Sequence, residues 1–94
     1  TPDLGYYLRN NSNIKMIGFD FISLSSYSNR QLGRKSHKAF LARLDNKIKS
    51  LDPILIIEDM DLSALNTKPL QIIISPIRFN LSDGSPATVI AILE

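Results

Sequence analysis

The chain has 94 residues, the length of one domain or of part of one, and 44% of them are hydrophobic against 21% charged. This balance is typical of globular proteins and argues against intrinsic disorder. A net charge of +2 is far from the dense basic surface that nucleic-acid binding requires, and no apolar run is long enough to span a bilayer. Without cysteine there is no disulfide or thiolate site, so we expect a soluble cytoplasmic protein.

The first third of the chain predicts a short helix, a buried strand and a loop. Pro2 and Asp3 favour a helix start, and Asn10-Asn11 should end it. Residues 14–22 are rich in strand-forming side chains, and Gly18 among them indicates a bulge or a close backbone approach. Residues 23–33 are rich in serine, which is typical of a loop.

The clearest helical pattern follows this loop. His37 shares one helical face with apolar side chains, namely Phe40, Leu41, Leu44, Ile48 and Leu51. Asp52-Pro53 should end the helix, because the residue before a proline is disfavoured in helical conformation. We expect His37 at the N-terminal start of this helix, where the helix dipole favours the neutral imidazole that ligates metal or accepts a proton.

The rest of the chain predicts β-structure. Strands are expected at 54–57, 70–74 and 87–93, with the last two paired as a hairpin across a long connection. Pro76 interrupts the pattern after the second of these segments, and residues 83–86 should form a turn before the third. The fold class is therefore α+β with α/β-like character, a mixed sheet with one main helix.

Two residues stand out as candidates for chemistry. His37 is the single histidine of the chain, and Glu58 is one of two glutamates and ends the apolar run at 54–57. Alternative interpretations are a histidine that packs at a helix start and a glutamate that emerges into solvent. Two ligands are too few for a catalytic zinc, which usually takes three from the protein.

Other polar residues have weaker claims. Asp20 and Ser23 could face a substrate, but such residues more often end strands and form turns. Asp59 and Asp61 could add carboxylates near Glu58, although solvated turn residues fit their pattern better. Residues 25–30 could gate or line a pocket, pack between subunits or form an ordinary surface loop.

Four segments, taken together and in order, resemble the C-terminal part of the cyclase family, which includes kynurenine formamidases and isatin hydrolases. The family has a Gly-x-Asp-x-x-Ser strand end, a His-x-x-Leu-Leu-like helix, an Ile-x-Glu-Asn-Leu-like strand end and a closing Asp-Gly-Ser-Pro-x-Arg-x-x-Ala strand. The matching segments of this chain are 18–24, 36–41, 56–62 and 83–91.

The resemblance implies a metal-dependent hydrolase of amide or lactam-type C–N bonds in a small-molecule substrate. It further implies part of a swivelling β/β/α fold, a homo-oligomer, and zinc or manganese that polarises the carbonyl and activates water. His37 and Glu58 occupy the family positions of metal ligands or adjacent acid/base groups. No nucleic-acid or membrane partner is implied.

Three departures from the family pattern qualify this expectation. The main signature, His-x-Gly-Thr-His-x-Asp-x-Pro, is absent, residues 43–50 resemble an insertion, and Thr88 stands where the family often has arginine. We therefore expect the chain to be inactive by itself and to need an N-terminal half that supplies the remaining ligands. The alternative is a non-catalytic α+β assembly or binding module, or a degenerate remnant of the family.

Overall fold

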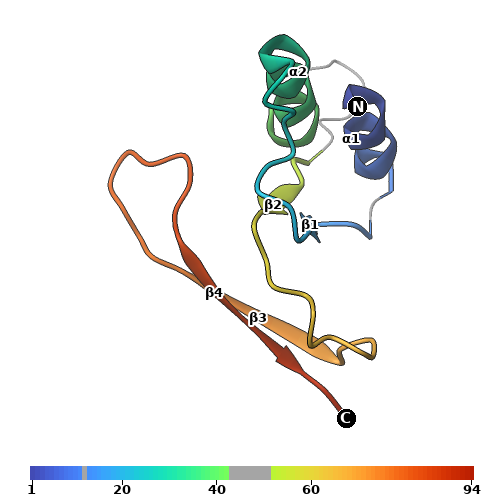
Figure 1. Cartoon of the computed structure of the whole chain (residues 1–94), viewed down its shortest axis with the longest axis vertical. Helices are drawn as coiled ribbons and strands as arrows, with labels where there is room; N and C mark the ends of the chain where they lie inside the picture. Colours follow the sequence, from blue (N-terminus) through green and yellow to red (C-terminus); the bar gives the residue numbers. More distant parts are fainter. Residues whose placement is uncertain (12, 43–51) are drawn as a thin grey trace. The chain divides into compact units, whose positions relative to one another are not determined.

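The computed structural model describes residues 1–11, 13–42 and 52–94. These residues divide into two compact units, Thr1–Leu62 and Ser63–Glu94. The first unit contains two helices and a parallel pair of strands, and the second contains an antiparallel hairpin (Figure 1). The α+β class expected from the sequence is confirmed.

The helices of the first unit pack directly on each other. Helix α1 (Pro2–Arg9) lies beside helix α2 (Arg30–Leu41), as Figure 1 shows. A Cβ atom added to Gly5 would lie 2.9 Å from the Cβ of Ala39, so the missing side chain allows this close approach. Arg9 is buried and donates a hydrogen bond from Nη1 to the carbonyl oxygen of Ala39 at 2.9 Å. The helix pair is therefore fixed by both packing and a polar contact.

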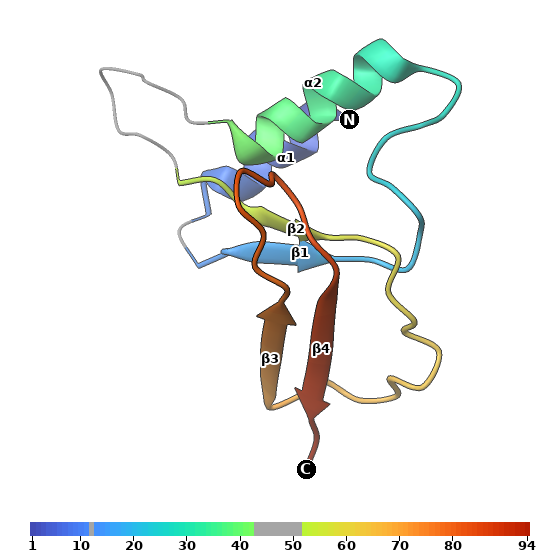
Figure 2. The ribbon, with the colours of Figure 1, turned by 90° about the vertical axis from the view of Figure 1, so that its left-hand side faces the viewer.

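The parallel strands complete the core of this unit. Strand β1 (Met16–Gly18) lies beside β2 (Leu55–Ile57) in Figure 2, and the two strands pair with Ile17 opposite Ile56. The Ile54 amide donates to the Phe40 carbonyl at 2.8 Å, which ties the start of β2 to the end of α2. Ala39 and Phe40 are 0% exposed and Ile54 is 1% exposed, so the core lies between α2 and this strand.

The second unit is a two-stranded sheet. Strand β3 (Gln71–Pro76) pairs antiparallel with β4 (Ala87–Ile92), from Gln71 opposite Ile92 to Pro76 opposite Ala87. Because residues directly opposite each other share a face, one face is entirely apolar. It carries Ile72, Ile74, Pro76, Ala87, Val89 and Ala91. No residue of this unit is buried.

The hairpin and the short first helix were predicted correctly, and at Gly18 it is the Met60 side chain rather than another backbone segment that comes close. A Cβ on Gly18 would lie 2.6 Å from the Met60 sulfur. The strand expected at 14–22 is shorter, because the chain turns beyond Gly18. There the Phe19 amide donates a hydrogen bond to the Ile57 carbonyl, and the Phe19 carbonyl accepts one from the Met60 amide. The parallel and antiparallel pairs form separate sheets rather than one mixed sheet.

The start of the main helix was predicted wrongly. It begins at Arg30, inside the segment expected to be loop, because Asn29 caps it by accepting a hydrogen bond from the Leu32 amide at 3.0 Å. His37 consequently lies in the C-terminal half of α2, and the dipole argument for a neutral imidazole does not apply. The predicted helix positions Leu44, Ile48 and Leu51, and the insertion at 43–50, lie outside the described residues. Among those described, no helix has the length and apolar character needed to cross a membrane.

Candidate functional site

The two residues singled out by the sequence meet in the first unit. His37 extends from α2 and Glu58 follows β2, and their Nε2 and Oε1 atoms are 3.3 Å apart. The side chains are 33% and 32% exposed. We call this pair the dyad. It is solvent-accessible enough to reach a bound molecule and buried enough to be held in place.

One oxygen of Glu58 accepts several hydrogen bonds. Besides His37, the Leu24 amide donates to Oε1 at 2.8 Å and the Ser23 hydroxyl donates at 3.3 Å. The short connection after β1 thus wraps around the carboxylate. These donors suit an ionised carboxylate, which can only accept hydrogen bonds.

The other side of the dyad is equally well held. The Ser25 hydroxyl lies 2.8 Å from Nδ1 of His37, and the Gly33 carbonyl oxygen lies 3.1 Å from the same atom. A Cβ on Gly33 would be 2.6 Å from both Cβ and Oγ of Ser25. Only glycine at this position lets Ser25 come so close to the imidazole.

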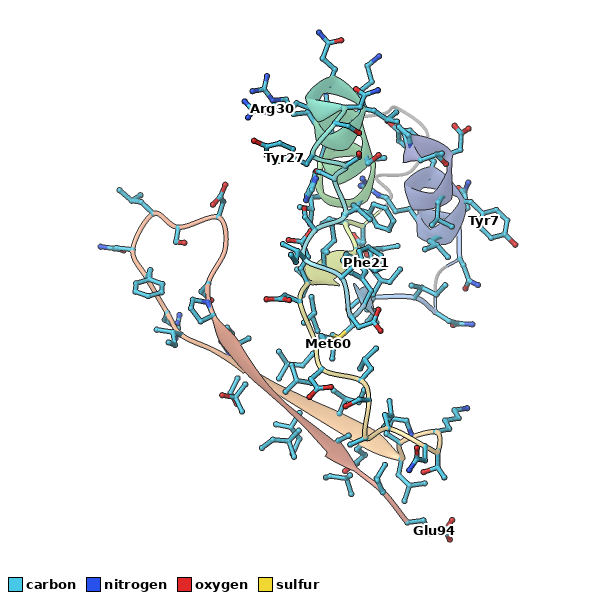
Figure 3. The ribbon with its side chains drawn as sticks, in the orientation of Figure 1. Tyr7, Phe21, Tyr27, Arg30, Met60 and Glu94 are labelled. Carbon is cyan, nitrogen blue, oxygen red and sulfur yellow. The ribbon has the colours of Figure 1, made fainter. Side chains whose placement is uncertain are left out.

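An open groove of about 900 Å³ adjoins the dyad. Its lining includes His37 and Ser25, the side chains of Phe21 and Tyr27, and two arginines of α2, Arg30 and Arg34. The guanidinium carbon of Arg30 is 5.7 Å from the Tyr27 ring centroid, within cation–π range, and Figure 3 shows the two side chains close together. The groove therefore combines aromatic walls with two positive charges and one carboxylate, that of Asp20.

The described residues do not fit a metal centre by themselves. No group of three or more histidine, aspartate or glutamate side chains comes together among them. Both ring nitrogens of His37 already have partners in the protein, and one of these partners is Glu58. Ligation of zinc or manganese by His37 and Glu58 stays a prediction, and it would require the metal ion to replace the proton between Nε2 and Oε1.

The remaining candidates are distributed around this site. Asp20 lines the groove, and Ser23 contacts Glu58 rather than only ending a strand. Asp59 is exposed, with the left-handed φ of 57° typical of a turn residue. Residues 25–27 and Arg30 line the groove, one of the roles considered for that segment.

Sequence reasoning did not identify Ser25. Its serine-rich surroundings gave no means of choosing one hydroxyl over its neighbours. The one useful signal was Gly33, which lies four residues before His37 and therefore on the same helical face as the imidazole.

The chain was compared with protein families, curated proteins and solved structures, and none of these comparisons gave a match. The resemblance to the cyclase family stays a prediction.

Proposed function

We propose that this chain supplies the acid/base pair of a metal-dependent hydrolase that cleaves amide or lactam-type C–N bonds in small molecules. The observation that carries the proposal is the 3.3 Å contact between His37 Nε2 and Glu58 Oε1 at the edge of the groove. The order of the four sequence segments that resemble the cyclase family supports the same reaction class.

Hydrolysis of such a bond needs two proton transfers. A proton must leave the attacking water, and the departing nitrogen must gain one. An imidazole paired with a carboxylate can perform both once Nδ1 of His37 exchanges its contact with Ser25 for one with the attacking water, because the carboxylate orients the ring and stabilises its positive charge. Glu58 is itself held by Ser23 and Leu24, so the ring is oriented against a fixed partner.

The groove suits an aromatic substrate. Phe21 and Tyr27 offer ring surfaces for stacking, and Arg30 and Arg34 place positive charge where a carboxylate would be attracted. Hydrolysis of an amide or lactam releases a carboxylate, so this charge would also favour the product side of the reaction.

The proposal includes zinc or manganese, a homo-oligomeric state and a cytoplasmic location. Because the described residues bring together only the dyad, further metal ligands would come from residues outside them, in this chain or in other polypeptide. Neither of the two proton transfers depends on these metal ligands.

A second candidate function is a non-catalytic assembly module. The unit at 63–94 favours it, because that unit has no buried residue and presents one wholly apolar face. Large exposed apolar surfaces commonly mark sites of protein association.

Hydrolysis by the complete gene product, loaded with zinc or manganese, distinguishes the two functions. N-formyl arylamines and lactams are suitable substrates. We expect Glu58→Gln and His37→Gln each to lower kcat/KM by about 10²–10⁴-fold, the usual contribution of a general acid or base. Asp59→Asn, next to Glu58 but exposed, is the matched control and should keep its activity.

Failure of the metal-loaded protein to hydrolyse any of these substrates would reject the hydrolase and favour the assembly module. Equal activity of all three variants and the unaltered protein would reject the dyad as its acid/base pair. For the 94-residue chain alone, titration with zinc and manganese should show only weak binding, and His37→Ala should change it little.

A further inference from the structure

We propose that Ser25 is a positioning residue that holds His37 in the tautomer with its proton on Nε2, directed at Glu58. The inference deepens the proposed function and rests on it for its catalytic meaning. It depends, however, only on the hydrogen-bonding groups around the dyad.

The first step concerns the proton between His37 and Glu58. The Leu24 amide can only donate, so it occupies an acceptor site of Oε1. The Ser23 hydroxyl oxygen accepts from the Ser25 amide at 3.1 Å, which directs its own hydrogen toward Oε1. An oxygen that accepts two hydrogen bonds in this way is poorly placed to carry a proton of its own. The proton of the dyad therefore belongs on Nε2 of His37.

The second step concerns the opposite ring nitrogen. A neutral imidazole with its proton on Nε2 has a lone pair on Nδ1, which needs a donor. The Gly33 carbonyl at 3.1 Å can only accept, so it cannot serve this lone pair. The Ser25 hydroxyl at 2.8 Å can donate to it. Of the two groups at Nδ1, Ser25 alone supports the tautomer that the carboxylate requires.

The two groups thus favour opposite tautomers. Without the hydroxyl of Ser25, the Gly33 carbonyl would favour a proton on Nδ1 and leave a bare Nε2 facing the carboxylate. Three consecutive residues, 23–25, hold both members of the dyad, so one short segment sets the position of the proton as well as that of the side chains. In this tautomer neither ring nitrogen is available to a metal ion.

The single histidine of the chain makes the test direct. With ¹⁵N-labelled histidine, the ring gives one spin system, and the ¹⁵N shifts at a pH where it is neutral report which nitrogen carries the proton. We expect a protonated, pyrrole-type Nε2 and a pyridine-type Nδ1. Ser25→Ala should increase the fraction of the Nδ1-protonated form, because the Gly33 carbonyl then competes with Glu58 for the ring proton.

Two further variants separate this role from a general effect on the fold. Ser26→Ala is the matched control, because its exposed hydroxyl pairs with Ser28 and not with the dyad, and it should leave the tautomer unchanged. Gly33→Ala keeps the Ser25 hydroxyl but its Cβ would displace it, so this variant should reproduce the effect of Ser25→Ala. The amide spectrum of each variant confirms that it is folded.

A proton on Nδ1 in the unaltered chain would overturn the inference. So would an unchanged tautomer in both Ser25→Ala and Gly33→Ala. No substrate enters these measurements, so an inactive protein with the expected tautomer would reject the proposed function and keep the role of Ser25. An active protein with the opposite tautomer would reject the role of Ser25 and keep the proposed function.

Discussion

The two units of the chain bury their apolar side chains to very different degrees. In the unit at 1–62, Ala39, Phe40 and Ile54 are at most 1% exposed, whereas the unit at 63–94 has no buried residue. The first is a layered core of two helices on a parallel strand pair, and the second is a hairpin held by cross-strand pairs. An isolated two-stranded hairpin is marginally stable in water. The stability of the chain should therefore reside in the unit that carries the dyad.

The substitution with the largest expected effect on stability is truncation of an aromatic side chain in the core. Phe40→Ala removes a fully buried ring and should lower the free energy of unfolding by about 3–5 kcal/mol. Phe79→Ala, in the second unit, removes a ring that is 57% exposed and should have little effect. Urea unfolding followed by circular dichroism measures both. Similar losses in the two variants would contradict a stability concentrated in the first unit.

A smaller effect is expected from the polar contact between the helices. Arg9→Met keeps much of the side-chain volume but removes the donor to the Ala39 carbonyl. Hydrogen bonds from charged groups contribute about 1.5–3 kcal/mol, so we expect a loss of about 2 kcal/mol in the same urea experiment. A neutral result would mean that packing at Gly5 alone holds the helices together.

The cap of α2 should contribute less again. Asn29→Ala removes the acceptor for the Leu32 amide and should cost about 1 kcal/mol. Asn29→Asp preserves the acceptor and adds a negative charge at the positive end of the helix, so it should be neutral or stabilising. Thermal unfolding of the two variants side by side checks the sign as well as the size.

The smallest change is expected in the hairpin. Ile90→Thr keeps a β-branched side chain at a position that is half exposed and lies opposite Ile73. The main unfolding transition should move by less than about 0.5 kcal/mol. A loss as large as that of Phe40→Ala would show that both units unfold as one cooperative structure.

Parts of the fold that depend on residues adjacent in the sequence could be predicted from the sequence. Pro2 and Asp3 mark the start of α1, and the turn residues at 83–86 separate the two strands of the hairpin. The start of α2 was missed because Asn29 lies among serines and close to a glycine. In that composition, one capping side chain does not distinguish a helix start from a loop.

The candidate site likewise has residues that could be predicted from the sequence and contacts that could not. His37 and Glu58 could be identified because each is rare in this chain and borders an apolar segment. Ser23 and residues 25–30 were also considered, but the contacts of Ser23 and Ser25 with the dyad could not be predicted, because each joins separate segments, 35 residues apart for Ser23 and Glu58 and 12 for Ser25 and His37. Such contacts depend on how β1, β2 and α2 pack, which local patterns do not encode.

The missing side chain at Gly33 has a consequence for attempts to improve this protein. Alanine in a helix interior is favoured over glycine by about 1 kcal/mol, so Gly33 is an obvious target for a stabilising substitution. The same substitution would push Ser25 away from His37. An engineered chain selected only for heat resistance would thus tend to lose the arrangement of its dyad, and position 33 marks where thermostability and chemistry make opposing demands on one residue.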